Sequence, residues 1–272
     1  MKKLLLVIIF LFLSITLTSA SLISMGVTVS NTVALDGSSG ESIVSAVNSG
    51  DEAAYNVQIS LLDLLNNNLV VGEINSLLRP GKETKNTFKL DFSNITLPGT
   101  YPLLVTVDYR DANNYPFSAI AQATFNYKEA TNSLLKMQSN PVKLADKATL
   151  SLDITNLNSD PKKIDIYAVA PRELIIKDNT RVIDLGGQKS TTLTFKMSSL
   201  SAIPKSKYPV FIVATYKDNN RFYSNIISSP VEIVTVEKKS ILRLPTFFGI
   251  GAVAILVLVI TILQFRKRKD SL

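Results

Sequence analysis

Acidic and amide side chains gather at two places in the chain, and oxygen atoms of this kind could bind a calcium ion. The first segment is Asp111-Ala112-Asn113-Asn114 and the second is Asp218-Asn219-Asn220. Both lack the several carboxylates and the roughly twelve-residue loop of a strong calcium motif. Asp and Asn are also the residues that a hairpin turn needs where φ is positive. We therefore interpret both segments as turns and predict no metal site.

Side chains for other common catalytic chemistry are scarce. The chain contains no His and no Cys, which excludes zinc sites of the usual type, disulfides and Cys–His nucleophiles. The carboxylate pair Asp51-Glu52 falls in an expected turn, and no acid–base partner for it can be recognised. No phosphate-binding loop and no Gly-x-Ser-x-Gly elbow occurs. We expect a protein without a cofactor that is not an enzyme.

Asn94-Ile95-Thr96 is the one N-glycosylation sequon of the chain. It stands just before the turn residues Pro98-Gly99, where an attached glycan would have space. Short sequons also arise by chance, and a host need not use them. Asn94 is therefore a candidate glycosylation site, and the sequence is compatible both with an attached glycan and with an unmodified asparagine.

The N-terminal residues 1–20 have the three-part pattern of a secretory signal peptide. Lys2 and Lys3 give the positive start, Leu4 to Leu13 is apolar throughout, and Thr18-Ser19-Ala20 offers small residues for cleavage. The apolar stretch alone is too short to span a bilayer, which favours removal. An uncleaved anchor that extends to Ala20 is the alternative.

The C-terminal part of the chain predicts one transmembrane helix at 246–265, since twenty residues without a charge cover about 30 Å, the thickness of the hydrocarbon core. The basic cluster Arg266, Lys267, Arg268 and Lys269 follows directly and indicates the cytoplasmic side. We expect a single-pass plasma-membrane protein with its N-terminus outside, a juxtamembrane linker at 239–245 and a cytoplasmic tail at 266–272.

The net charge of +7 invites a nucleic-acid partner, but most of it comes from the two ends. Lys2, Lys3 and the tail 266–272 contribute +5, so residues 21–245 carry only +2. Such a weak, dispersed charge gives no footprint for a phosphate backbone, and we expect no nucleic acid as partner. The charge is uneven, with 6 basic and 10 acidic residues in 21–128 and 17 and 11 in 129–245. The basic half could rest near anionic headgroups or polymers, or carry ordinary solubilising charge.

An internal repeat organises the segment between the ends. Aligning residues 78–115 on 185–222, a shift of 107 without a gap, gives eleven identities, where about two or three are expected by chance. They are Leu78/Leu185, Lys82/Lys189, Thr84/Thr191, Thr87/Thr194, Phe88/Phe195, Lys89/Lys196, Tyr101/Tyr208, Pro102/Pro209, Tyr109/Tyr216, Asp111/Asp218 and Asn113/Asn220. We infer two homologous domains, at 21–128 and 129–238.

Each repeat has the length and the alternating pattern of a small β-sandwich. Apolar residues occupy every second position in Tyr101 to Arg110, and the second copy repeats this from Tyr208. Further strands are expected at 42–47 and 55–61, with counterparts at 149–154 and 163–169. The predicted fold is all-β, with two tandem immunoglobulin-like β-sandwich domains followed by one transmembrane α-helix. The absence of Trp and Cys excludes the antibody-type core.

The order of turns and strands in the first repeat resembles a known family. Val47-Asn48-Ser49-Gly50-Asp51, Leu78-Arg79-Pro80-Gly81 and Pro98-Gly99-Thr100-Tyr101-Pro102 are similar to turns of the CARDB-type and S-layer-associated immunoglobulin-like domains of archaeal and bacterial surface proteins. The second repeat departs from this pattern at Asp160-Pro161 and Lys205-Ser206-Lys207. The resemblance implies a β-sandwich fold and a surface setting, and it implies no catalytic residue.

These observations favour a non-enzymatic surface protein whose two domains bind another protein or an envelope polymer, in an adhesion or scaffold role. Binding would use edge strands or loops. An alternative is a single-pass accessory subunit of a membrane transport or secretion complex. A carbohydrate-binding module is a third hypothesis, which the lack of Trp disfavours because sugar platforms use exposed aromatic rings.

Overall fold

The computed structural model describes residues 22–34, 36–64 and 68–235, and all regular structure within them is β-strand. The prediction of an all-β protein is therefore confirmed for this part of the chain. No helix in these residues is long and apolar enough to cross a membrane. The predicted signal peptide at 1–20, the linker at 239–245, the transmembrane helix at 246–265 and the tail at 266–272 lie outside the described residues.

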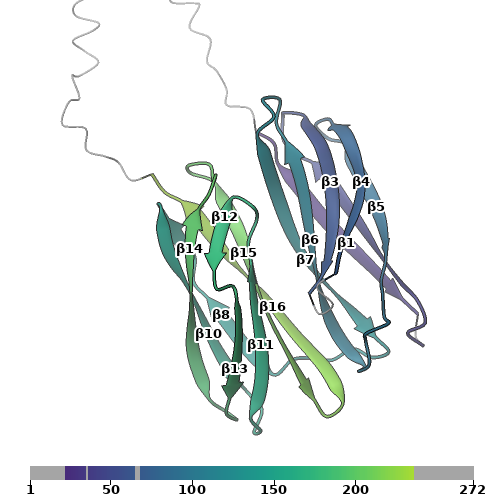
Figure 1. Cartoon of the computed structure of the whole chain (residues 1–272), viewed down its shortest axis with the longest axis vertical. Helices are drawn as coiled ribbons and strands as arrows, with labels where there is room; N and C mark the ends of the chain where they lie inside the picture. Colours follow the sequence, from purple (N-terminus) through teal and green to yellow (C-terminus); the bar gives the residue numbers. More distant parts are fainter. Residues whose placement is uncertain (1–21, 35, 65–67, 236–272) are drawn as a thin grey trace, which may run out of the picture. The chain divides into compact units, whose positions relative to one another are not determined.

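The first repeat folds into a sandwich of two antiparallel sheets (Figure 1). One sheet has the order β1 (Met25–Val33), β2 (Gly40–Asn48) and β5 (Glu83–Lys89). The other has the order β4 (Asn68–Leu78), β3 (Ala54–Asp63), β6 (Gly99–Arg110) and β7 (Pro116–Tyr127).

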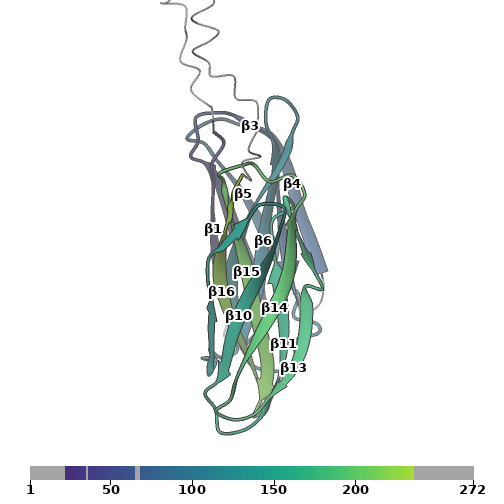
Figure 2. The ribbon, with the colours of Figure 1, turned by 90° about the vertical axis from the view of Figure 1, so that its left-hand side faces the viewer.

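The second repeat forms the same two layers, and Figure 2 shows the axes of its strands roughly aligned with one another. One sheet has the order β12 (Leu174–Lys177), β14 (Ser190–Ser199), β10 (Lys147–Asn156) and β8 (Leu135–Ser139). The other has the order β13 (Thr180–Leu185), β11 (Lys162–Val169), β15 (Lys207–Asp218) and β16 (Arg221–Ile233). The short strand β9 (Val142–Leu144) pairs with β16 in parallel.

This strand order is that of an immunoglobulin-like sandwich, in which the two sheets share a Greek-key connection. Two equivalent tyrosines support the assignment. Tyr101 donates its hydroxyl to the carbonyl of Leu97 at 2.6 Å, and the hydroxyl of Tyr208 accepts the Ile203 N–H at 3.0 Å. A tyrosine bonded to backbone a few residues upstream is the tyrosine corner of such folds.

Each sandwich has its own hydrophobic core, made by the inward residues of both sheets. Val57, Ile59 and Leu61 of β3 are fully buried, as are Ile164, Ile166 and Ala168 of β11 at a shift of 107. Phe88 and Phe195 complete the pattern from the opposite sheets. The apolar residues thus follow the period of two that the sequence predicts.

A buried asparagine corrects the alignment of the two repeats. Asn48 donates to the carbonyls of Glu52 and Leu78, and Asn156 donates to those of Asp160 and Leu185. The two side chains have the same role, yet they are 108 residues apart. The predicted counterpart 149–154 of the strand at 42–47 is therefore wrong by one residue. The two turns have the same length, and the shift returns to 107 because β3 has one extra residue in a bulge between Tyr55 and Gln58, where Asn56 has a positive φ of 50°.

Candidate functional site

The predicted modification site Asn94 lies in a turn between β5 and β6, and its side chain is exposed. Ile95 beside it is buried and donates its N–H to the carbonyl of Phe92 at 3.0 Å. The turn is thus held from inside while Asn94 faces outward, so glycosylation stays a prediction that the local geometry permits. The basic cluster Arg266, Lys267, Arg268 and Lys269 lies outside the described residues.

The acidic and amide segments have turn roles. The Asp111 carboxylate accepts the N–H groups of Asn113 at 2.9 Å and Tyr115 at 2.7 Å. Asn219 and Asn220 take positive φ values of 46° and 61° in the matching hairpin. Within the described residues, no three carboxylates come together in a group that could hold a metal ion.

The two sandwiches are joined by Phe222, the second residue of β16. Its ring lies in the core of the first sandwich, where it stacks on Tyr101 with centroids 4.3 Å apart. Its backbone pairs with Gly99 in parallel, and its N–H donates to the carbonyl of Pro98 at 2.9 Å. A Cβ on Gly99 would stand 2.0 Å from the Phe222 carbonyl oxygen, so only glycine permits this approach. One continuous sheet therefore runs through both sandwiches.

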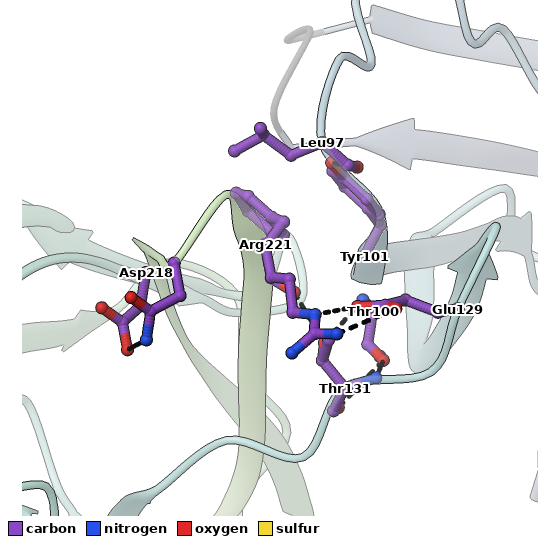
Figure 3. A network of polar contacts seen from close by, with 9 residues as sticks. Leu97, Thr100, Tyr101, Glu129, Thr131, Asp218 and Arg221 are labelled. Atoms are coloured by element: carbon purple, nitrogen blue, oxygen red, sulfur yellow. Dashed lines mark hydrogen bonds and ion pairs between the residues drawn. The ribbon is translucent and has the colours of Figure 1, made fainter.

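Polar side chains surround this joint (Figure 3). The Thr131 hydroxyl donates to the carbonyl of Phe222 at 2.6 Å and accepts the N–H of Thr100 at 2.9 Å. Ser224 donates its hydroxyl to the carbonyl of Thr100 at 2.9 Å. Arg221 forms an ion pair with Glu129 in the segment that connects the two repeats. Hydrogen bonds thus satisfy the backbone groups that the joint buries.

The second polar contact between the sandwiches centres on Glu173, which is 1 % exposed. Its carboxylate accepts the Ser118 N–H at 2.7 Å and the Ser118 hydroxyl at 2.9 Å. The neighbouring Arg172 lies 3.4 Å from Asp108 of the first sandwich. Burial raises the pKa of the Asp108 carboxyl, and the charge of Arg172 opposes that shift in part.

Apolar contacts between these two polar clusters are made by equivalent residues of the two repeats. Leu104 and Phe211, which are 107 apart, pack in one cluster with Leu62 and Val169, which are also 107 apart. β7 runs antiparallel to β6 whereas its counterpart β16 runs parallel to β6, so the equivalent strands point in opposite directions. The apolar cluster thus brings equivalent residues of the two repeats together, whereas Phe222 and its exposed counterpart Tyr115 have different roles.

The edge strand β4 presents an apolar stripe to solvent. Val71 pairs with Ser60 and Ile74 pairs with Gln58, so Gly72 and Glu73 together face one residue of β3 and form a β-bulge. The bulge returns Ile74 to the outer face that Leu69 and Val71 share. We call these three residues the edge stripe. Leu69 is 56 % exposed, Val71 is 51 % exposed and Ile74 is 60 % exposed.

Gly72 lies close to Asn86, since a Cβ there would stand 2.7 Å from the Asn86 side chain and would require it to shift. Beyond β4, the described residues supply no further strand to this sheet. The backbone groups along that margin are therefore available to an added strand.

The corresponding edge of the second sandwich differs. β13 has six residues against eleven in β4, and Val182 is its one large exposed apolar residue. Arg181 and Asp184 place charges of both signs on it, whereas Glu73 is the one charge of β4. Charges and short length protect an edge from pairing, so β13 is protected and β4 is not.

The sequence patterns missed both the joint and the edge stripe. Phe222 aligns with Tyr115 of the first repeat, which is 64 % exposed, so residue type alone did not separate their roles. For the stripe, the segment from Leu69 to Ile74 was a usable signal, since Gly72 interrupts an apolar run without a turn motif.

No protein-family model matches this chain, and no curated protein matches it. Among solved structures, it is similar to trypsin-activated alpha-2-macroglobulin from Escherichia coli, with 13 % identity over 78 % of this chain and 18 % of that chain and a TM-score of 0.33. It is also similar to red sea bream transglutaminase, with 12 % identity over 75 % of this chain and 31 % of that chain and a TM-score of 0.26. The similarity to the Escherichia coli chaperone DraB has 13 % identity over 39 % of this chain and 57 % of that chain, with a TM-score of 0.28. The chain thus spans about a fifth of the first macroglobulin chains it matches.

Proposed function

We propose that this protein is a non-enzymatic cell-surface protein whose edge stripe on β4 binds an extended segment of a protein partner. The exposure of Leu69, Val71 and Ile74 beside a free strand margin carries this proposal. A partner strand would gain main-chain hydrogen bonds from β4 and bury its own apolar residues against the stripe. Glu73 favours a basic residue opposite it in the partner.

The proposed setting is the outer face of the plasma membrane, with a single span and the C-terminus in the cytoplasm. Support for it comes from the signal-peptide pattern at 1–20, the apolar stretch 246–265 and the basic residues 266–269. The finer relationship to CARDB-type and S-layer-associated domains also belongs to this proposal. It rests on the turn motifs of the first repeat and on the immunoglobulin-like strand order.

A second candidate is an accessory subunit of a membrane transport or secretion complex. Phe222 and the buried Glu173 favour it, because a fixed joint suits a part that must hold one geometry within an assembly. In that case the predicted span would pack on a multi-spanning protein, and β4 would contact an exterior portion of the same complex.

Site-specific photo-crosslinking on intact cells tests the proposal. The crosslinking amino acid replaces Val71 on β4 in one variant and Val182 on β13 in the control, since both positions are exposed on sheet edges. We expect one defined protein crosslinked at Val71 and none at Val182. Val71→Lys should abolish complex formation and Val182→Lys should leave it unchanged, because a charge on an edge opposes pairing.

The identity of the crosslinked protein separates the two candidates. A surface or envelope protein supports the adhesion or scaffold role, and a multi-spanning transporter or secretion component supports the subunit role. Equal crosslinking at both positions, or recovery of an envelope polymer alone, would overturn binding through the edge stripe.

A further inference from the structure

A basic groove lies on the outer face of the second sandwich, where β10, β14 and β12 lie side by side. Its volume is about 400 Å³. Its lining includes three lysines, two hydroxyl groups and one exposed apolar residue: Lys147, Lys177, Lys196, Thr149, Ser198 and Ile175. No carboxylate lines it, and within the described residues none of the three lysines has an ion-pair partner. The acidic neighbours along the chain, Asp146 and Asp178, lie outside the lining.

The strand register places two of these lysines against each other. Lys196 of β14 faces Lys177 of β12 on one side and Thr149 of β10 on the other, and Lys147 faces Ser198. Like charges directly opposite across a ladder destabilise a sheet. An anion held between them would remove that repulsion, so the groove has the charge arrangement of an anion site.

The first repeat serves as an internal comparison. Lys89 is the counterpart of Lys196, and it faces Glu41 of β2. Asp91 stands where the second repeat has Ser198. The same lysine thus faces a glutamate across the strand pair in one repeat, and a lysine and a threonine in the other. General solubility does not require this difference, because both positions are exposed on a sheet face.

We propose that this groove binds the phosphate of anionic lipid headgroups on the membrane that anchors the protein. The lysine ammonium groups would pair with the phosphate, the hydroxyls of Thr149 and Ser198 would donate hydrogen bonds to it, and Ile175 would contact the glycerol region. The proposal uses the predicted span at 246–265, and it does not depend on the partner of β4.

The exit point of the chain favours a lipid over a soluble polymer. Val234 donates its N–H to the carbonyl of Leu144 at 2.9 Å, and Leu144 ends β9 only three residues before Lys147. The chain therefore leaves the second sandwich at the end where the groove lies. Residues 235–245 separate this point from the predicted span, a reach of roughly 36–40 Å when fully extended. The groove can accordingly meet the headgroups without strain.

Vesicle flotation with the soluble segment 22–235 tests the proposal. Both cores and the joint are built from residues 22–234, which form part of one compact unit, so this segment contains everything that the fold requires. The probes are vesicles of phosphatidylglycerol and phosphatidylcholine in equal parts, vesicles of phosphatidylcholine alone, and soluble polyphosphate. We expect binding to the anionic vesicles and none to the neutral ones.

The variant K147Q/K177Q/K196Q should bind the anionic vesicles about 100-fold more weakly, since each lysine near an anionic surface contributes about a fivefold factor. The matched control K163Q/K189Q/K217Q removes the same charge from exposed lysines of the same repeat. It should change binding less than tenfold.

Circular dichroism and the thermal midpoint of each variant establish that it is folded. An equal loss of affinity for anionic vesicles in both variants would show that binding depends only on overall charge, and would contradict a binding site in the groove. Binding to polyphosphate without binding to vesicles would identify a soluble phosphate polymer as the ligand of the groove, and would contradict the proposal of a lipid headgroup.

Discussion

Ser42 is fully buried in the first sandwich, and its hydroxyl has no hydrogen-bond partner within the described residues. At a shift of 108, the equivalent position in the second sandwich is Leu150, which is also fully buried. A buried hydroxyl without a partner keeps the cost of losing water. The first core therefore contains a buried polar atom without a hydrogen bond.

Ser42→Ala should raise the free energy of unfolding by about 1 kcal/mol, because it removes the unpaired hydroxyl and adds no volume. Urea unfolding of the segment 22–235 measures the change. Ser30→Ala, at an exposed position of β1, is the control and should stay within about 0.5 kcal/mol of the parent. A loss of stability in Ser42→Ala would mean that the hydroxyl has a favourable partner.

Tyr109 sets a limit on alkaline stability. Its burial raises its pKa to about 12, and the nearby Glu173 adds to the shift. A raised pKa in the folded state means that this tyrosine supports folding below pH 10, its usual pKa, and that the support is lost as the pH rises from about 10 to 12.

Tyr109→Phe should therefore move the alkaline unfolding midpoint to higher pH, because phenylalanine has no proton to lose. Fluorescence during an alkaline titration follows the unfolding. Tyr115→Phe changes an exposed ring and should leave the midpoint unchanged. An unaltered midpoint in Tyr109→Phe would assign alkaline unfolding to other groups.

At the scale of elements, one asparagine closes the same turn in each sandwich. Asn48 joins the end of β2 to the end of β4 by donating to the Leu78 carbonyl, and it accepts the Gly50 N–H at 3.1 Å. Asn156 repeats both bonds with Leu185 and Asn158. These bonds connect strands of opposite sheets, so the side chain contributes to the alignment of the two layers.

Asn48→Ala and Asn156→Ala should each lower the free energy of unfolding by about 2–3 kcal/mol, since buried backbone groups lose their partners. Thermal unfolding by calorimetry measures both. Asn132→Ala, at an exposed position of the connecting segment, should change stability by less than about 0.5 kcal/mol. Equal small effects at all three positions would contradict a structural role for the buried pair.

At the scale of the whole molecule, we expect the joint to make the two sandwiches unfold as one cooperative unit. Phe222 belongs by sequence to the second sandwich and by packing to the core of the first. The apolar cluster around Leu104 and Phe211 adds a second contact. Unfolding one sandwich therefore exposes part of the other, which favours a single transition.

Phe222→Ala should split the unfolding of segment 22–235 into two calorimetric transitions, because removing a buried phenylalanine costs about 3–5 kcal/mol and leaves a cavity in the first core. The first sandwich should show the lower midpoint. Tyr115→Ala, at the equivalent exposed position, should keep one transition. A single unchanged transition in Phe222→Ala would show that the joint does not couple the sandwiches.

Much of the fold could be predicted from the sequence, because strands and turns depend on residues that are close together in the chain. In the strand around Tyr101 to Arg110 and its copy at 207–218, every second residue lies in a sandwich core as the period of two predicts. Residues between them, such as Leu104 and Phe211, are buried as well, which the period did not predict. The segments Asp111 to Asn114 and Asp218 to Asn220 were also correctly predicted as turns. The Asp111 carboxylate accepts backbone N–H groups within four residues, and the backbone of Asn219 and Asn220 has positive φ.

The sequence by itself determined that the described chain is all-β, that it is a repeat of two sandwiches, and where their apolar strands lie. Only the tertiary structure decided which surfaces are covered. Phe222 and Tyr115 are equivalent aromatic residues, and one is buried because the first sandwich lies against it. Lys196 and Lys89 are identical residues, and only strand pairing reveals that one faces a lysine and the other a glutamate. Contacts between distant segments set both outcomes, and they leave no mark in local spacing.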